Sequence, residues 1–179
     1  IAIGGFSTHD ASIGYFDSAL IEIICIFFMA ISGMNFALHF LALRSRSLKA
    51  YLADPECQTY LKILAATIIV TATVLLIYNY HDNPLLSIRY AAFQVVSVAT
   101  TTGFGITDFS VWPSFLPFLL LYTTFIGACA GSTGGGMKVM RVMLLYRQGQ
   151  REIQRLLHPN GVFTIKLGKR KVPDRVIES

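Results

Sequence analysis

The chain has 179 residues, of which 54% are hydrophobic and 14% charged, and its formal net charge is +5. Soluble domains usually carry about 25% charged residues, so this composition argues against an ordinary cytosolic enzyme, a disordered chain and a nucleic-acid-binding domain. The mean hydropathy of +0.56 favours a membrane protein, in which long apolar runs are expected. The three cysteines lie far apart without CxxC spacing, which predicts neither a disulfide framework nor a zinc site.

The first long apolar run, residues 17–43, predicts a membrane-spanning helix. Its last 26 residues would reach roughly 39 Å as a helix, enough to cross a hydrocarbon core of about 30 Å with tilt. We expect Glu22 and His39 to reach opposite interfaces, and Asn35, the deepest polar residue, to hydrogen-bond between helices. Residues 1–16 open on IAIGGFSTHD without a signal-peptide pattern, so we expect an internal segment of a longer protein.

A second span is predicted at residues 61–78, after a linker at 44–60. The apolar stretch that follows is shorter and contains Arg89, Gln94 and Ser97. Asn83 and Pro84 are a capping residue and a first-turn proline, which mark its start. Because it is too short and too polar to span, residues 84–98 predict a re-entrant half-helix.

A broken span is predicted at residues 113–157, because its apolar pattern is interrupted by GACAGSTGGGMK at 127–138. Close packing of small residues between helices is one alternative for this segment. A phosphate-binding loop is excluded, because that motif needs Gly-Lys-Ser/Thr and Gly136 is followed by Met137. We favour a non-helical loop within the membrane, since each glycine costs a helix about 1 kcal/mol relative to alanine.

The basic residues predict the orientation of the chain. Fourteen of the fifteen Lys and Arg residues would lie on one side of the membrane, and Arg89 alone on the other. The positive-inside rule makes the basic side cytoplasmic, including the linker at 44–60 and the tail at 158–179. Nucleic-acid binding or simple solubility would be the alternative explanations for a basic tail.

A short internal repeat links the two halves of the chain. GGFSTHD at 4–10 aligns with TGFGITD at 102–108, an offset of 98 residues. The second copy follows the half-helix, whose C-terminal dipole end would lie near the membrane centre and favour a cation. Carbonyls and threonine hydroxyls of the loop at 99–106 could then replace the hydration shell of an alkali ion. Asp10 and Asp108 could attract cations or cap local turns, and both readings stay open.

These loops resemble a known selectivity filter. Thr100-Thr101-Thr102-Gly103-Phe104-Gly105, repeated loosely at residues 3–6, is similar to the filter of the Trk/Ktr/HKT superfamily of cation transporters, and the tail at 144–179 resembles its bacterial TrkH branch. The resemblance implies an all-α polytopic membrane protein built from repeated units around a pseudo-fourfold pore. Each unit is a span, a pore half-helix, a filter loop and a second span. On this template, residues 1–43 end one unit and residues 61–157 form the next.

The same resemblance implies potassium uptake, by symport, across the inner membrane of a bacterium. It also implies a homodimer and a cytosolic nucleotide-binding regulatory subunit of the TrkA type. The transported ion would be K+, with no cofactor in this chain, no nucleic acid and no enzymatic activity. A sodium or mixed-cation transporter of the same superfamily, or a non-conducting membrane scaffold, would be the alternatives.

The resemblance implies two sets of site residues. The predicted potassium-binding filter residues are Ile3, Gly4, Gly5, Thr100, Thr101, Thr102 and Gly103. The predicted gate residues, in a loop that would close the pore beneath the filter, are Gly127, Gly131, Ser132, Thr133, Gly134, Gly135 and Gly136. No catalytic residues are predicted, because the chain lacks HExxH, Gly-x-Ser-x-Gly and paired carboxylates.

Overall fold

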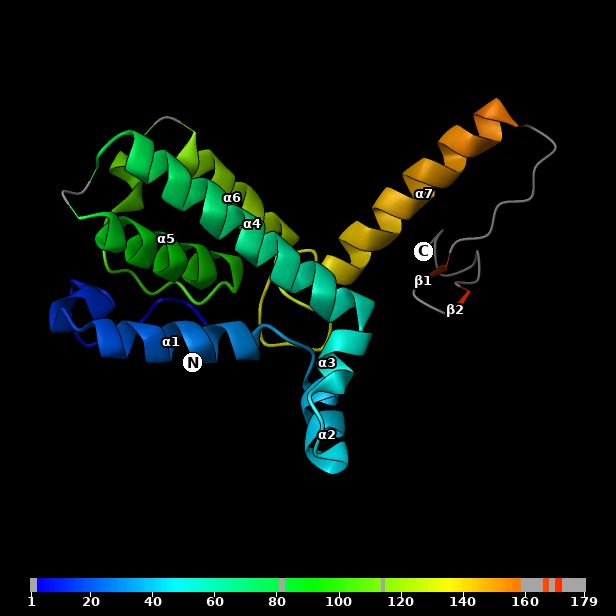
Figure 1. Ribbon diagram of the computed structural model, residues 1–179, viewed down its shortest axis with the longest axis horizontal. Coiled ribbons are helices and arrows are strands. Elements are labelled where there is room, and N and C mark those ends of the chain that lie inside the picture. Colours follow the sequence, from blue (N-terminus) through cyan, green and yellow to red (C-terminus); the bar gives the residue numbers. More distant parts are fainter. Residues whose placement is uncertain (1–2, 81–82, 114, 159–165, 168–169, 172–179) are drawn as a thin grey trace.

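The computed structural model describes residues 3–80, 83–113, 115–158, 166–167 and 170–171 (Figure 1). Most of the expected linker at 158–179 lies outside this set. The elements, in chain order, are η1 (Ser12–Phe16), α1 (Ala19–Ser32), α2 (Phe36–Ser45), α3 (Lys49–Ala53), α4 (Pro55–Ile77), α5 (Pro84–Ala99), η2 (Phe109–Val111), α6 (Leu116–Ile126), α7 (Val139–Leu157), β1 (Lys166–Leu167) and β2 (Arg170–Lys171). The described elements are therefore helices, apart from one antiparallel pair of two-residue strands.

Local capping explains where α4 and α5 begin. The Asp54 carboxylate accepts a 2.7 Å hydrogen bond from the amide of Cys57, and Pro55 follows as the first residue of α4. The Asn83 side chain accepts a 3.0 Å bond from the amide of Leu85 at the start of α5. Such caps satisfy amides that lack partners within the first turn of a helix.

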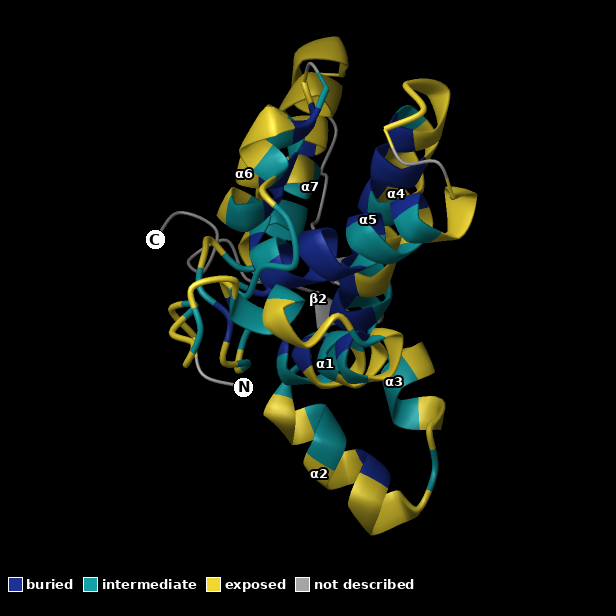
Figure 2. Ribbon diagram, turned by 90° about the vertical axis from the view of Figure 1, so that its left-hand side faces the viewer, coloured by how far each residue is buried: buried dark blue, intermediate teal, exposed yellow. Residues whose placement is uncertain are grey.

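The core forms where α4, α5 and α6 meet, and α1 packs against the other side of α5. Buried residues concentrate on the facing sides of α4 and α5 (Figure 2). Leu75 of α4, Val95 of α5 and Leu120 of α6 are all fully buried in this cluster. The half-helix α5 is thus enclosed by helices from both parts of the chain, which fixes the position of the loop at its C-terminal end.

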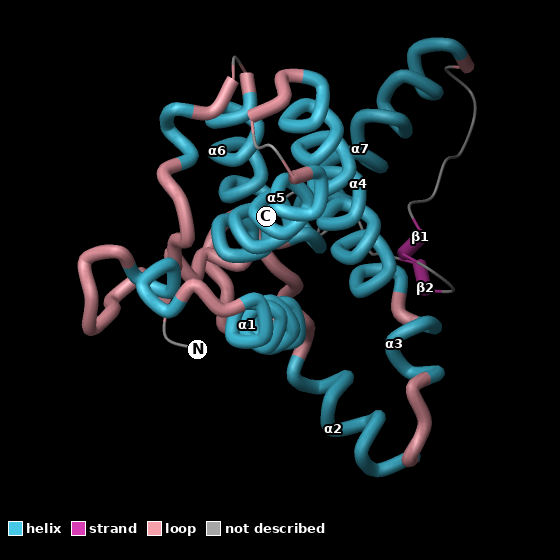
Figure 3. Tube along the Cα trace, turned by 60° about the vertical axis from the view of Figure 1, so that its left-hand side comes forward, coloured by secondary structure: helices cyan, strands magenta, loops and turns pink. Residues whose placement is uncertain are grey.

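Among the described residues, α4 is the one helix long and apolar enough to cross a membrane by itself. The pair α1 and α2 passes the same test together, but the two helices meet at 97°. Figure 3 shows α2 and α3 projecting away from the other helices, while α7 diverges in another direction.

The span expected at residues 17–43 is therefore not one continuous helix but two helices joined at a bend. The amide of Gly33 still bonds to the carbonyl of Met29, but Asn35 has an extended backbone and caps α2 by accepting from the amide of Ala37. A Cβ at Gly33 would lie 2.3 Å from the Tyr60 hydroxyl oxygen, so only glycine permits this close approach at the bend. Asn35 consequently acts as a helix cap, not as the helix–helix hydrogen bond predicted for it.

Glu22, which the sequence expects to reach a membrane interface, is buried within the protein. Its side chain is 2% exposed, and its carboxylate lies 2.8 Å from Nε of Arg89 on α5. Nη2 of Arg89 donates a 3.1 Å hydrogen bond to the same carboxylate. The charge is buried because an arginine far away in the sequence compensates it. His39 bonds to the hydroxyl of Tyr51 and to the carbonyl of Ile31.

Candidate ion-binding loops and gate

The structure brings the two glycine loops of the internal repeat together. The amides of Gly4 and Gly5 donate to the carbonyl of Thr102, at 3.2 and 2.8 Å. Gly5 and Gly103 have φ angles of +70° and +82°, and a Cβ on Gly5 would lie 2.5 Å from the carbonyl oxygen of Gly103. Both positions therefore require glycine, for backbone conformation and for space.

The C-terminal end of α5 holds the filter loop, residues 99–106. The Ser97 carbonyl accepts from the amides of Thr102 and Gly103, and the Ser97 hydroxyl donates a 2.6 Å bond to the carbonyl of Phe104. Farther along, the Gln94 side chain donates to the carbonyl of Thr107. The partial negative charge of this helix end thus lies beside the loop carbonyls, which favours a cation there.

The hydroxyls of Thr100 and Thr102 make local hydrogen bonds at the end of α5. The Thr100 hydroxyl donates a 2.7 Å bond to the carbonyl of Val96 and shares a 2.9 Å bond with the hydroxyl of Thr102. Both threonines are buried. The Val96 carbonyl also accepts the amide of Thr100, so this bond is the one that a threonine hydroxyl commonly makes to the carbonyl four residues earlier in a helix. Oxygen ligands for an ion would then be backbone carbonyls, each of which has two lone pairs.

Thr101 connects the filter loop to the glycine-rich loop, residues 127–138. Its hydroxyl donates to the carbonyl of Thr100 and accepts a 2.7 Å bond from the amide of Gly135. Its φ of +57° is unusual for a residue with a β-branched side chain. The two predicted sets of site residues are therefore in direct contact.

The glycine-rich loop contains no helix and docks on the bend between α1 and α2. The amide of Cys129 donates to the carbonyl of Gly33 at 2.9 Å, and the amide of Phe36 donates to the carbonyl of Gly131 at 3.1 Å. The Thr133 hydroxyl donates to the carbonyl of Ser32 at 3.2 Å. The break between α1 and α2 and the break between α6 and α7 thus supply hydrogen-bond partners for each other's unpaired backbone groups.

Within the loop, the remaining predicted gate residues fall into two groups. Gly127, Gly131 and Gly136 have φ values between +69° and +79°, which favours glycine. The Ser132 hydroxyl donates to the carbonyl of Cys129, and Gly134 is buried against Ala128. The Lys138 ammonium donates to the carbonyl of Gly134.

Sequence reasoning missed Glu56, which the structure places at this loop. Its carboxylate accepts a 2.6 Å hydrogen bond from the amide of Ala130. A glutamate just after a helix cap predicts only a first-turn acid that the helix dipole stabilises. The partner lies 74 residues away, so no local pattern could have indicated the contact.

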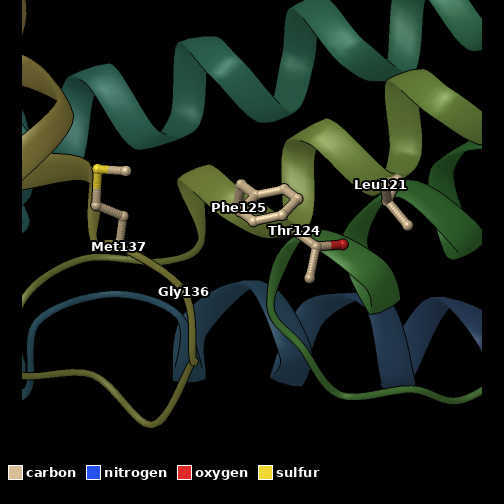
Figure 4. A pocket seen from close by; sticks show the side chains of 5 residues that line it. All are labelled: Leu121, Thr124, Phe125, Gly136 and Met137. Atoms are coloured by element: carbon tan, nitrogen blue, oxygen red, sulfur yellow. The ribbon is translucent and has the colours of Figure 1, made fainter.

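An apolar pocket of about 520 Å³ lies between the end of α6 and the loop (Figure 4). Its lining residues are Leu121, Thr124, Phe125, Gly136 and Met137. Its lining includes none of the predicted filter residues and is mostly apolar, so it does not resemble an ion site.

Comparison with known proteins gives the family. The whole chain, residues 1–179, matches the model of the family described as TrkH, cation transport protein. Two relatives called Trk system potassium uptake protein TrkH, from Salmonella typhimurium and Escherichia coli, are 52% and 53% identical over 179 residues. Each alignment covers the entire chain but 37% of the relative, so the chain spans just over a third of the length of these curated relatives. The crystal structure of the potassium transporter TrkH from Vibrio parahaemolyticus matches with a TM-score of 0.93 and 50% identity, over 98% of this chain and 38% of that one. The chain therefore belongs to the TrkH family of cation transport proteins.

Proposed function

We propose that this chain forms part of the pore of a protein that takes up potassium across the inner membrane of a bacterium. The observation that carries the proposal is the meeting of the two glycine loops, through the 2.8 Å bond from the Gly5 amide to the Thr102 carbonyl. They meet at the C-terminal end of a half-helix, where the helix dipole favours a cation. The relatives are named as potassium uptake proteins, so we propose K+ as the ion.

In this proposal, K+ is held by backbone carbonyls of the filter residues Ile3, Gly4, Gly5, Thr100, Thr101, Thr102 and Gly103. Carbonyls can replace the hydration shell of an alkali ion when the backbone around them is held in place. Residues 1–43 and 61–157 would contribute two of four loops around a pseudo-fourfold axis. The other two loops would come from parts of the protein outside this chain.

The glycine-rich loop would act as the gate beneath the filter. It contacts the filter through Thr101 and continues directly into α7, which diverges from the other helices (Figure 1). A cytosolic nucleotide-binding subunit of the TrkA type that binds α7 would move the loop without a long pathway of intervening contacts. Symport and a homodimer in the lipid membrane complete the proposal.

The test is ion flux through the complete protein, reconstituted in liposomes, with rubidium, potassium and sodium compared. We expect rubidium and potassium to pass in preference to sodium. Gly103→Val should reduce this preference, because a Cβ there would lie 2.9 Å from the amide nitrogen of Gly5 and the φ is positive. Gly149→Ala is the matched control, since a Cβ at that position meets nothing within 4 Å.

Three results would contradict the proposal. Equal passage of sodium would indicate a mixed-cation transporter, and the absence of any flux would indicate a scaffold. An unchanged rubidium preference in a folded Gly103→Val protein would show that this loop does not select the ion.

A further inference from the structure

Glu56 lies in the first turn of α4, yet its carboxylate interacts with two other segments of the chain. Its side chain is almost completely buried, at 2% exposure. Oε1 accepts the 2.6 Å bond from the amide of Ala130 in the glycine-rich loop. The backbone of Met140, in the first turn of α7, also interacts favourably with this carboxylate. One side chain therefore joins α4, the loop and α7.

The start of α7 explains why a carboxylate is needed there. The residue at its N-cap position is Lys138, whose side chain makes no capping hydrogen bond to the helix and bonds instead to the carbonyl of Gly134. The first amides of a helix lack partners and carry partial positive charge. Glu56 therefore brings a carboxylate from α4 to the end of α7 that has no side-chain cap of its own.

The bond from Ala130 ends on a carboxylate, unlike two other bonds that hold the loop. The contacts of Cys129 with Gly33 and of Gly135 with Thr101 join uncharged groups. A hydrogen bond to an ionised carboxylate is roughly twice as strong as one between neutral groups. A buried carboxylate that lost these partners would also be costly, so the arrangement opposes separation of the segments.

We infer that Glu56 is a positioning residue that locks the glycine-rich loop and the start of α7 to α4. Displacement of α7 from α4 removes Met140 from the carboxylate, and movement of the loop away from α4 breaks the bond from Ala130. The link between this lock and ion flow rests on the proposed function, whereas the lock itself does not.

Cys129 provides a direct probe of loop position, because it is fully buried beside Ala130. The experiment uses the complete protein, in which every cysteine except Cys129 is replaced by alanine, including Cys25 and Cys57. In this protein, Cys129 should react slowly with a water-soluble maleimide. We expect Glu56→Ala to raise the labelling rate at least tenfold when rates are compared per thiolate, from their pH dependence, because the loop loses its anchor and not only because a nearby negative charge is removed. Glu56→Gln, which retains one carbonyl oxygen as acceptor, should fall between the two.

Asp54→Ala is the matched control. Asp54 caps α4 by accepting from the amide of Cys57 and does not bond to Ala130, so its loss frays the same helix end without releasing the loop. Labelling of Cys129 should then stay within about twofold of the parent protein. The flux of rubidium without a regulatory subunit is measured in parallel.

The inference is overturned if Glu56→Ala folds and labels at the parent rate, or if Asp54→Ala labels as fast. If Glu56→Ala does not fold, Glu56→Gln decides: parent-rate labelling overturns the inference, and an increase supports it. Faster labelling with unchanged flux supports the lock and contradicts the role of the loop as a gate, so the two proposals fail separately.

Discussion

The ion pair between Arg89 and Glu22 allows a quantitative test of how α5 is held beside α1. Arg89→Met keeps the length of the side chain and removes its charge, which leaves the carboxylate of Glu22 buried without its cation. Removal of one partner of a buried pair costs about 3–5 kcal/mol. Because the Arg89 side chain is 21% exposed and that of Glu22 is 2% exposed, we expect the lower end, about 3 kcal/mol.

The assay is equilibrium unfolding of the purified complete protein in detergent, with increasing denaturant. The double variant Arg89→Met with Glu22→Leu should recover most of the lost free energy, because no unpaired charge remains in the interior. Asp17→Asn is the control: Asp17 also contacts Arg89, at 3.5 Å, but its side chain is 87% exposed. Exposed pairs contribute about 0–1 kcal/mol. A loss below 1 kcal/mol in Arg89→Met, or no recovery in the double variant, would refute the reasoning.

Four further outcomes are expected. Tyr60→Phe removes a hydroxyl that donates a 3.1 Å bond to a carbonyl of α1, and should cost about 1 kcal/mol in the same unfolding assay; no loss would mean that water replaces the bond. Gly127→Ala should reduce the yield of folded protein, since its Cβ would lie 2.3 Å from a loop carbonyl oxygen, and a normal yield would show that the loop adapts. Deletion of residues 132–135 should raise rubidium flux without a regulatory subunit, and parent flux in a folded deletion would argue for packing. Arg155→Glu should weaken co-purification of the regulatory subunit, and undiminished binding would place the contact elsewhere. Arg155 is chosen because Arg151 is only 6% exposed.

Local chemistry made part of the fold predictable. The start of α5 was predicted from Asn83 and Pro84, because a cap and a first-turn proline act on the residues that immediately follow. The interruption at 127–138 was predictable for a similar reason, since consecutive glycines weaken a helix wherever they lie.

The bend at 33–35 was not predictable, because the apolar run continues through it and single Gly and Asn residues are tolerated in helices. The bend is stabilised by Tyr60 and by residues 129–131, which lie far away in the chain. The same limitation applied to Glu22 and Glu56. Each buried carboxylate has its partner 67 or 74 residues away, so nothing in the neighbouring sequence indicated burial.

The hydrogen bonds between the α1–α2 bend and residues 129–131 bear on how the chain is inserted during synthesis. The carbonyl of Gly33 and the amide of Phe36 bond to a segment that leaves the ribosome about a hundred residues later. Until then, the peptide groups at the bend would lack partners in lipid, where only a continuous helix satisfies its backbone. We expect residues 17–43 to enter the bilayer as one straight helix, since their length suffices to cross it. The 97° bend would then form after translation of the downstream loop, as a late step of assembly.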